Sequence, residues 1–292
     1  MDLRTRLCLT ISQRLARPAM TRTVAYDAYQ RWRATALEDE WRLFSDAHVT
    51  GRSLLDFGCG DGQLSLFLGT TRSPERIVGV DLIPASIERA RIQAEHASLN
   101  CPVSFRVGSA ARIPVDDQSV DTVLAFDCLE HVMEPLAILR EWYRVIRPGG
   151  VCLLTWCPFK GPWGAHMESL IPVPWAPLLF GEKAVFQTAA SLYDMPSFES
   201  RHWDLEPDGQ KKPNKWRRWS SFAEQHYLNE LDFRTLRGLT DEVGFRIDRL
   251  EGQPWAGSTL RRQAGRILMG LPMVGEYFVS KALVELRKPA HA

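Results

Sequence analysis

The sequence carries little net charge and has no long run of apolar residues. Its 36 Lys and Arg nearly balance 35 Asp and Glu, and the formal net charge of +1 excludes a chain that binds polyanions over its whole surface. The longest apolar-biased stretch, 267–286, is interrupted by a proline and three charged residues, so it makes a poor membrane-spanning helix. The first twenty residues lack the continuous apolar core of a secretory signal.

Paired cysteines are absent as well. The six cysteines are scattered without C-x-x-C spacing, so we expect free, reduced thiols and a cytoplasmic location. No group of His, Cys, Asp or Glu has the spacing of metal ligands, and we therefore expect no metal requirement. One cysteine, Cys59, lies inside a glycine-rich turn around which the rest of the chain is organised.

That turn follows a short apolar run. Residues 53–57 are typical of a buried strand, glycine then recurs as Gly58, Gly60 and Gly62, and a helix is expected from about Gln63. Glycine permits positive φ and lets a ligand approach the backbone, while the first N–H groups of the helix point over the loop. This geometry suits a nucleotide. The dinucleotide fingerprint G-x-G-x-x-G needs its third glycine at Gln63, which disfavours an NAD-dependent oxidoreductase.

The run Asp56-Phe-Gly-Cys-Gly-Asp-Gly62 resembles the first motif of class I S-adenosylmethionine (SAM) methyltransferases, in particular the ubiquinone- and menaquinone-biosynthesis branch. Leu129-Glu-His-Val132 and Arg144-Val-Ile-Arg-Pro-Gly-Gly-Val151 follow in the order of that family. Over residues 51–157 the resemblance implies SAM as cofactor and an α/β, Rossmann-like sheet of seven strands, mostly parallel with the last antiparallel, with helices on both faces. The cofactor-binding residues that it implies are Asp56, Gly58, Cys59, Gly60, Gly62, Asp81, Leu82, Ser109, Ala110 and Phe126.

Two of these positions can be argued from their chemistry. Asp81 ends the apolar strand 76–81, where its carboxylate can accept hydrogen bonds from both hydroxyls of a ribose. The alternative is that Asp81 caps the helix beginning near Pro84. Relatives usually carry an acid at the position of Ser109, where it bonds the adenine amine, so a hydroxyl predicts a weaker contact without charge assistance.

Candidate catalytic residues follow strands four and five. Asp127 to His131 come directly after the strand expected at 120–126, and the carboxyl ends of such strands hold the ligand in open α/β sheets. A histidine suits proton removal near neutral pH, which makes His131 a candidate base and Asp127 a second candidate. The alternative for both is a residue that only caps or packs. Gly164-Ala-His166 resembles an element of some relatives, so His166 is the other candidate base, ahead of His202.

Composition divides the chain into four parts. Residues 1–50 show apolar residues at helical spacing and are expected to form an N-terminal helical segment. Residues 51–157 are expected to form the SAM-binding core, and the Trp- and Pro-rich residues 158–230 an inserted substrate cap. Residues 231–292 are expected to complete the core and to include a basic amphipathic excursion. The tryptophans of the cap suit an apolar or planar substrate, or alternatively fill the cap's own core.

Two segments are basic. Residues 211–218 contain five cations, which is typical of a solvated loop, with contact to an anionic substrate, a membrane or nucleic acid as the alternative. Residues 259–288 contain six cations against two acids, a local net charge of +4. A segment of this kind packs on its own domain or at a dimer interface, or it makes peripheral contact with an anionic membrane. We place packing first.

The sequence therefore predicts a SAM-dependent methyltransferase of small-molecule biosynthesis with a small, lipophilic or aromatic acceptor. O-methylation is expected ahead of C- or N-methylation, and no nucleic-acid partner is expected. A neutral hydroxyl or an amine cation needs a base, whereas an enolate or a phenolate does not. The alternatives are a non-catalytic or membrane-associated protein that keeps the fold, and an NAD-dependent oxidoreductase.

Overall fold

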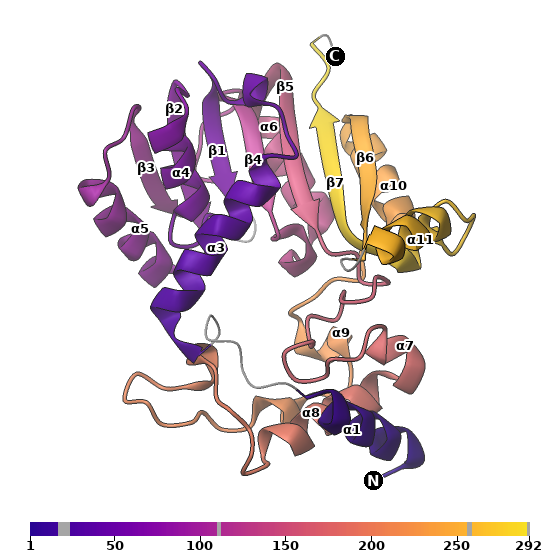
Figure 1. The fold of residues 1–292 in the computed structure, drawn as a ribbon. Coiled ribbons are helices and arrows are strands. Elements are labelled where there is room, and N and C mark those ends of the chain that lie inside the picture. The colour runs from indigo at the N-terminus through magenta and orange to yellow at the C-terminus, as the bar shows by residue number, and fades with distance from the viewer. Residues whose placement is uncertain (17–23, 110–111, 256–258, 291–292) are drawn as a thin grey trace. The chain divides into compact units, whose positions relative to one another are not determined.

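The structure is a computed structural model that describes residues 1–16, 24–109, 112–255 and 259–290. The chain forms two compact units (Figure 1). The sheet unit consists of Arg33–Trp156, Leu231–Gln253 and Lys281–Ala292, and the helical unit consists of Met1–Trp32, Cys157–Glu230 and Pro254–Ser280. The segment predicted as a substrate cap thus lies in the helical unit, together with the start of the chain and a second excursion.

The sheet unit is built on seven strands in the order β3-β2-β1-β4-β5-β7-β6. Strands β1 to β5 pair in parallel and β7 runs antiparallel to β5, so the predicted fold is confirmed. The order runs outward from β1 in both directions, which places a topological switch point between β1 and β4. The strands are β1 (Ser53–Phe57), β2 (Arg76–Asp81), β3 (Val103–Val107), β4 (Val120–Phe126), β5 (Ile146–Trp156), β6 (Arg246–Pro254) and β7 (Val279–Arg287).

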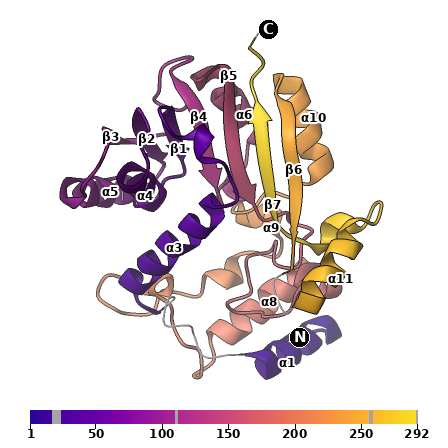
Figure 2. The same cartoon turned by 45° about the horizontal axis from the view of Figure 1, so that its top comes forward.

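Helices cover both faces of this sheet because alternate strand residues point to opposite faces (Figure 2). Leu54 and Leu124 pack in one core with residues of α3 and α4. Leu55 and Val123 pack in the other core with residues of α6 and α10. The helices and 3₁₀ turns of this part are α3 (Tyr26–Trp41), which belongs to the sheet unit from Arg33 on, η1 (Asp46–His48), α4 (Gln63–Thr71), α5 (Pro84–His96), η2 (Leu129–His131), α6 (Pro135–Val145) and α10 (Phe233–Val243).

Residues 147–150 read Arg-Pro-Gly-Gly, which is typical of a stop between helix and strand, but they belong to β5 in the structure. Strand β5 begins at Ile146 opposite Val120, and its pairing with β4 shifts register before Val151. Gly149 has φ +82°, a conformation that glycine adopts without strain. The Pro-Gly-Gly run therefore forms an irregularity inside the strand instead of a loop ahead of it.

The helical unit has a core of its own. The rings of Trp216 and Trp219 lie 6.3 and 6.4 Å from that of the fully buried Phe186, and Trp175 packs against Trp255 at 5.5 Å. Trp216 and Trp219 are partly buried and pack against the core of this unit, which agrees with the second of the two roles that the sequence left open. The elements are α1 (Leu3–Leu15), α7 (Ala176–Phe180), α8 (Glu182–Tyr193), η3 (His202–Asp204), η4 (Lys215–Arg218), α9 (Phe222–Gln225), α11 (Thr259–Met269) and η5 (Gly275–Phe278).

The basic segment 211–218 is tied to the helical unit. The Lys211 Nζ donates to the Tyr193 carbonyl oxygen at 2.5 Å and lies 4.2 Å from the centre of the Tyr193 ring. The Lys212 Nζ donates to the Trp203 carbonyl oxygen at 3.1 Å. Arg217 also pairs with Asp194 at 2.6 Å, so three of the five cations hold this segment in place, which is more order than a solvated loop implies.

The C-terminal excursion forms α11, η5 and strand β7. The Lys288 Nζ donates to the carbonyl oxygens of Tyr143 and Ile146 at 2.8 and 2.9 Å, and Arg287 pairs with Asp248 at 2.5 Å. The positive charges of Arg287 and Lys288 therefore make contacts within the fold. Among the described residues, no helix combines the length and the apolar character needed to cross a bilayer.

Candidate functional site

The glycine turn leads from β1 into α4 with three residues in the left-handed region: Gly58 at φ +73°, Gly60 at +53° and Gly62 at +85°. The outer two are enclosed. A Cβ at Gly58 would lie 2.9 Å from the Cβ of Cys128, and one at Gly62 would lie 2.8 Å from Cζ of Phe105. At Gly60 the nearest such atom is 4.0 Å away, so there is open space beside the backbone. The middle glycine is therefore the position at which the loop leaves room for a ligand.

This difference predicts that alanine at Gly60 mainly lowers cofactor affinity, whereas alanine at Gly62 mainly lowers the stability of the fold. Gly60→Ala is expected to strain the backbone by about 1 kcal/mol and to lower cofactor affinity at least about tenfold, because the methyl group occupies the open space. Gly62→Ala is expected to destabilise the fold by about 3 kcal/mol through strain plus overlap with the Phe105 ring. Thermal unfolding and cofactor titration of both variants measure this. The reverse order of effects would show that Gly60 does not face the ligand.

Asp81 ends β2 directly beside the glycine turn. The Gly60 N–H donates to its Oδ2 and the Ile83 N–H to its Oδ1, each at 2.9 Å. These bonds fix the plane of the carboxylate and leave lone pairs on both oxygens for a further donor. Leu82 and Ile83 follow as exposed apolar side chains. Carboxylate and apolar surface thus occur together, as a ribose carrying a flat base requires.

Asp56 lies in β1 and is almost completely buried. The Ser65 Oγ of α4 donates to its Oδ2 at 2.7 Å, so this carboxylate links the strand to the helix across the glycine turn. Burial raises the pKa of Asp56 from its ordinary value of 3.8 to about 6, against the opposing effect of the Ser65 hydrogen bonds. Asp56 thus holds the turn while carrying charge in an unfavourable environment at neutral pH.

Asp56→Asn is expected to change how stability depends on pH. Because the folded pKa is raised, the native state binds the proton more tightly, and this stabilisation is present below about pH 4 and lost as the pH rises past about 6. The change from 3.8 to about 6 corresponds to about 3 kcal/mol. The free energy of unfolding of Asp56→Asn, relative to the unsubstituted chain, should therefore rise by up to about that amount between about pH 4 and 8. Urea unfolding at both pH values measures it, and a constant difference would contradict a buried, ionising Asp56.

Asp61, inside the turn, is held by α5. The Arg89 Nε and Nη2 donate to its two carboxylate oxygens at 2.8 and 3.0 Å, and the Gln93 amide donates to its carbonyl oxygen at 3.2 Å. A bidentate guanidinium–carboxylate pair fixes orientation as well as distance. Nothing in the sequence distinguishes this pair, because an arginine on the following helix has no characteristic spacing from Asp61.

The thiols of the site are buried. Cys59 packs against Phe105 and α5, and Cys128 adjoins Gly58. Burial raises the pKa of both thiols well above the ordinary range, with nearby carboxylates adding to the effect. All six cysteines of the chain are free. Because the thiolate is the nucleophilic form, Cys59 and Cys128 are suited to packing and not to covalent chemistry.

Three other predicted cofactor residues have distinct surroundings. The Ser109 hydroxyl accepts from the Arg112 N–H at 3.0 Å and so closes a short turn. Ala110 lies outside the described residues. Phe126 is buried, and its ring stacks on Phe44 with centroids 5.2 Å apart. The side chain of Phe126 is therefore part of the core of the sheet unit.

Asp127, the next residue, lies in a partly buried cluster of charges. Its φ is +49°, and its carboxylate is 2.7 Å from the Arg33 Nη1 of α3 and 2.7 Å from the Lys281 Nζ of β7. Burial raises the pKa of Asp127, but the charges of Lys281 and Arg33 outweigh it and hold the pKa below its usual range. A carboxylate stabilised in this way is a weak proton acceptor, which favours a positioning role over general-base chemistry.

Glu40 of α3 completes this cluster. It accepts a hydrogen bond from Lys281, and the Thr155 Oγ1 of β5 donates to its Oε2 at 2.8 Å. Burial, and then the charge of Asp127, raises the pKa of Glu40. The cluster therefore joins α3, β5 and β7 at the carboxyl end of β4. The sequence does not predict that Arg33, Glu40 and Lys281 belong to this cluster, because they are far apart in the chain and match no motif.

The candidate histidines lie in different units. His131 ends η2 in the sheet unit, and its backbone N–H donates to the Cys128 carbonyl oxygen at 3.0 Å, so the structure brings it to the same strand end as Asp127. His166 lies in the helical unit in a left-handed conformation, φ +50°. His202, also in the helical unit, packs against Tyr29 with ring centroids 4.9 Å apart.

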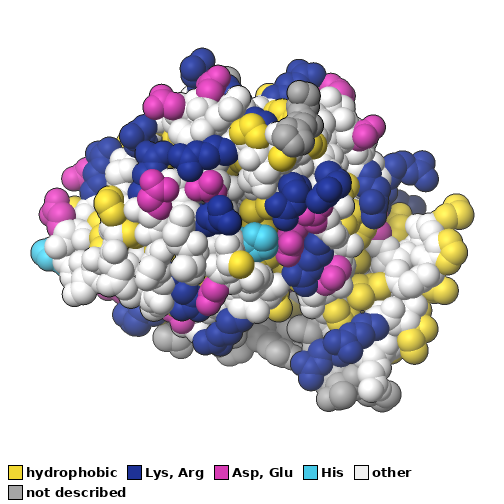
Figure 3. Space-filling view, turned by 90° about the horizontal axis from the view of Figure 1, so that it is seen from above, with side chains coloured by type: hydrophobic (Ala, Val, Ile, Leu, Met, Phe, Trp, Pro, Cys, Tyr) yellow, Lys and Arg dark blue, Asp and Glu magenta, His cyan; other side chains and the backbone are white. Residues whose placement is uncertain are grey.

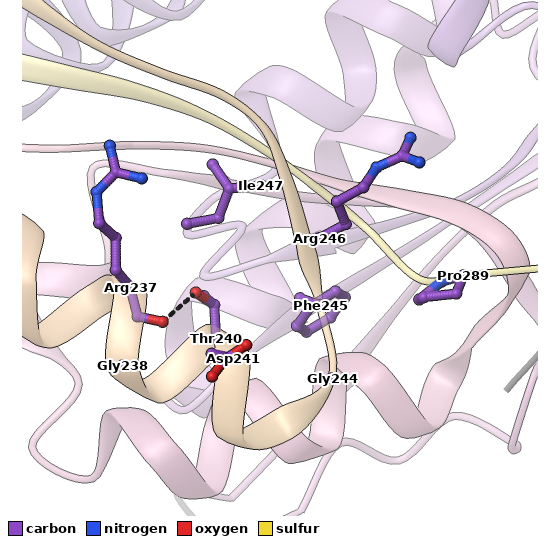
Figure 4. Close-up of a pocket in the computed structure, with 9 residues that line it drawn as sticks. All are labelled: Arg237, Gly238, Thr240, Asp241, Gly244, Phe245, Arg246, Ile247 and Pro289. Atoms are coloured by element: carbon purple, nitrogen blue, oxygen red, sulfur yellow. Dashed lines mark hydrogen bonds between the residues drawn. The ribbon is translucent and has the colours of Figure 1, made fainter.

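An open hollow of about 680 Å³ lies elsewhere on the sheet unit (Figure 4). Pro289, on its rim, follows β7, whose Arg287 pairs with Val151 near the amino end of β5. The hollow is therefore at the sheet edge opposite the glycine turn, and its residues are not assigned to the site. They are Arg237, Gly238, Thr240, Asp241, Gly244, Phe245, Arg246, Ile247 and Pro289.

Sequence comparison finds the same part of the chain. Residues 55–154 match a family model described as a methyltransferase domain. An uncharacterized methyltransferase of Mycobacterium ulcerans is 33% identical over 145 residues, which are 50% of this chain and 54% of that protein. A protein of Mycolicibacterium smegmatis, named a probable S-adenosylmethionine-dependent methyltransferase, is 35% identical over 106 residues, 36% of this chain and 38% of that protein. The chain thus spans about half the length, or less, of these curated relatives.

Solved structures are similar in fold. A methyltransferase solved with the Trm112 activator of Haloferax volcanii has a TM-score of 0.51 and 19% identity, covering 91% of this chain and 97% of that one. An S-adenosylmethionine-dependent methyltransferase from Mesorhizobium loti has a TM-score of 0.50 and 15% identity, covering 87% and 96%. The resemblance to methyltransferases is confirmed, and these names agree with the expected cofactor. The quinone-biosynthesis branch stays a prediction.

Proposed function

We propose that the chain, whose residues 55–154 match a family model described as a methyltransferase domain, is a SAM-dependent methyltransferase with a small, lipophilic or aromatic acceptor. The observation that carries the proposal is the contact between the Gly60 N–H and the Asp81 carboxylate, 2.9 Å, beside a backbone with open space. This is the switch-point end of the sheet, where open α/β folds bind nucleotides. The residues present fit an adenosyl group.

In this proposal Asp81 accepts the ribose hydroxyls and Gly60 allows the ligand to reach the loop. The exposed side chains of Leu82 and Ile83 supply apolar surface for the adenine. When bound, SAM supplies an electrophilic methyl group on a sulfonium. The chain then has to orient the acceptor behind that methyl carbon and to exclude water, and orientation of this kind supplies much of the rate.

The candidate catalytic residues differ in how well they can accept a proton from the acceptor. Two cations hold the Asp127 carboxylate in its ionised form, so Asp127 is better suited to positioning than to accepting a proton. We assign the base, where the acceptor needs one, to His131 or His166, since imidazole titrates near neutral pH. O-methylation is the preferred reaction, ahead of C- or N-methylation.

An aromatic cluster in the helical unit supports the proposed acceptor class. The rings of Tyr29, Trp32, His202 and Trp203 lie within about 6 Å of their neighbours, and Trp32 and Trp203 remain partly exposed. Rigid aromatic surfaces of this kind bind apolar or planar molecules at low cost in conformational entropy. We propose these rings as acceptor contacts.

Calorimetric titration of the full chain with SAM, and separately with NAD, tests the proposal. Saturable SAM binding without NAD binding is the expected result, because Gln63 stands where the dinucleotide fingerprint needs glycine. Saturable NAD binding without SAM binding would overturn it. Incubation with methyl-labelled SAM and host lysate fractions should then yield a labelled product. SAM binding with no labelled product from any fraction would favour the non-catalytic alternative.

A further inference from the structure

The helical unit presents an exposed apolar turn at the end of α11. Residues 267–274, here called the apolar tip, contain no charged residue. The exposed fraction is 73% for Ile267 and 96% for Met273, and Leu271 and Val274 are exposed as well. Single exposed apolar residues are ordinary on protein surfaces, whereas four within eight residues form a patch that needs a partner.

The apolar tip has a defined backbone. The Gly270 N–H donates to the Ile267 carbonyl oxygen at 3.1 Å, and the Gly275 N–H to the Leu271 carbonyl oxygen at 2.9 Å. Met273 has φ +66°, a conformation that is unfavourable for a residue with a side chain. The turn thus keeps the Met273 side chain exposed although its backbone is strained. Packing of this side chain on the helical unit cannot be the reason for the strain, because the side chain is 96% exposed.

A second pair of apolar side chains adjoins the tip. Trp175, the N-cap of α7, donates from its indole Nε1 to the Tyr277 carbonyl oxygen at 2.7 Å, only three residues beyond Val274. The following turn of α7 exposes Leu178 to 65% and Leu179 to 58%. The start of α7 is therefore linked to the segment that follows the apolar tip, and both α7 and the tip carry exposed apolar side chains.

Positive charge flanks this surface. Arg262 and Arg266 lie four residues apart on α11, hence on one side of the helix, and both are exposed. Gly265 packs on Pro254, where an added Cβ would be 2.9 Å from the proline Cβ, so the side of α11 that carries Gly265 is covered. Figure 3 shows hydrophobic side chains gathered on the surface at the right, where Figure 1 has α11.

We propose that the apolar tip and the exposed leucines of α7 form a peripheral docking surface for an anionic phospholipid bilayer. Ile267, Leu271 and Met273 insert at the boundary between head groups and acyl chains, and Arg262 and Arg266 lie against the anionic head groups. Charge complementarity selects this occupant, since an apolar patch beside exposed arginines suits a negatively charged interface. The proposal does not depend on methyl transfer.

Sedimentation with lipid vesicles tests the proposal on the full chain. The chain is expected to sediment with vesicles of phosphatidylcholine containing about 25% phosphatidylserine, and much less with phosphatidylcholine alone. Ile267→Asp/Met273→Asp should lower the bound fraction at least about tenfold, because two charges then enter the interface. Arg262→Glu/Arg266→Glu should remove the preference for phosphatidylserine while leaving the apolar tip intact.

Ile92→Asp is the matched control, since it places the same charge on an exposed isoleucine of α5 in the sheet unit. This variant should bind vesicles like the unsubstituted chain, and circular dichroism should show all variants folded. Equal loss in Ile92→Asp, or binding unchanged in Ile267→Asp/Met273→Asp, would overturn the proposal. So would self-association, measured by analytical ultracentrifugation, that Ile267→Asp/Met273→Asp abolishes, because the surface would then join two copies of the chain.

Discussion

Asp81→Ala is expected to weaken SAM binding by about 100- to 1,000-fold, since two hydrogen bonds to an ionised acceptor are worth about 3–4 kcal/mol together. The substitution also removes the acceptor of the Gly60 N–H, so the turn loses the contact that orients its open position. Calorimetric titration with SAM measures the affinity, and thermal unfolding shows that the variant is folded. Affinity unchanged within about threefold would exclude Asp81 from the ribose site.

Two further substitutions test whether the loss of SAM affinity is specific to the Asp81 carboxylate. Asp81→Asn keeps one acceptor oxygen but places an amide where the carboxylate receives the Gly60 or Ile83 N–H, so a loss of at least about tenfold is expected. Ser109→Ala should lose less than about tenfold, because that hydroxyl is uncharged and already bonds Arg112. An equal loss in all three variants would indicate a general disturbance of the loop instead of a specific contact.

Lys281→Met is expected to destabilise the sheet unit by about 3–5 kcal/mol, because it leaves the carboxylates of Asp127 and Glu40 buried without the ammonium group that both contact. Methionine keeps the length of the side chain, so the loss is mainly electrostatic. Glu40→Gln added to Lys281→Met should recover about 1–2 kcal/mol, since one of the two negative charges is removed and Thr155 keeps an acceptor. Urea unfolding of the single and double variants measures both effects.

The pH dependence checks the same cluster. In the unsubstituted chain the lowered pKa of Asp127 stabilises the fold above about pH 4, and this contribution is lost on further acidification. Without Lys281, protonation of Asp127 or Glu40 relieves the excess negative charge, so the variant should approach the unsubstituted chain as the pH falls from about 8 to 5. A difference in unfolding free energy that stays constant over this range would contradict the electrostatic explanation.

The parts of the site that lie close together in sequence were predictable. The glycines of 58–62 and the acid of Asp81 each follow an apolar strand, so alternation and turn chemistry place them at one edge of a parallel sheet. The structure brings the Gly60 N–H and the Asp81 carboxylate within hydrogen-bond distance, as that edge requires. Gly244 is a further example, since a glycine is typical of a helix end and this one follows α10 with φ +95°.

The features that the sequence did not predict depend mostly on contacts between residues far apart in the chain. Glu40 and Lys281 are 241 residues apart in the chain, and only the placement of β7 beside β5 brings them to Asp127. No local pattern distinguishes such a lysine from one that is solvated. The roles of the cap tryptophans were open for the same reason, because Trp216 and Trp219 pack on Phe186 of a preceding helix. The irregularity of β5 escaped since Pro-Gly-Gly is also typical of a loop.

A crystal structure of the chain with SAM tests the central claim most directly. The account predicts the adenosyl group over the glycine turn, with the ribose hydroxyls within hydrogen-bond distance of the Asp81 carboxylate and no side chain between the ligand and Gly60. Crystals grown at saturating SAM that show no ligand at this edge of the sheet, or a ligand that leaves Asp81 uncontacted, would contradict it.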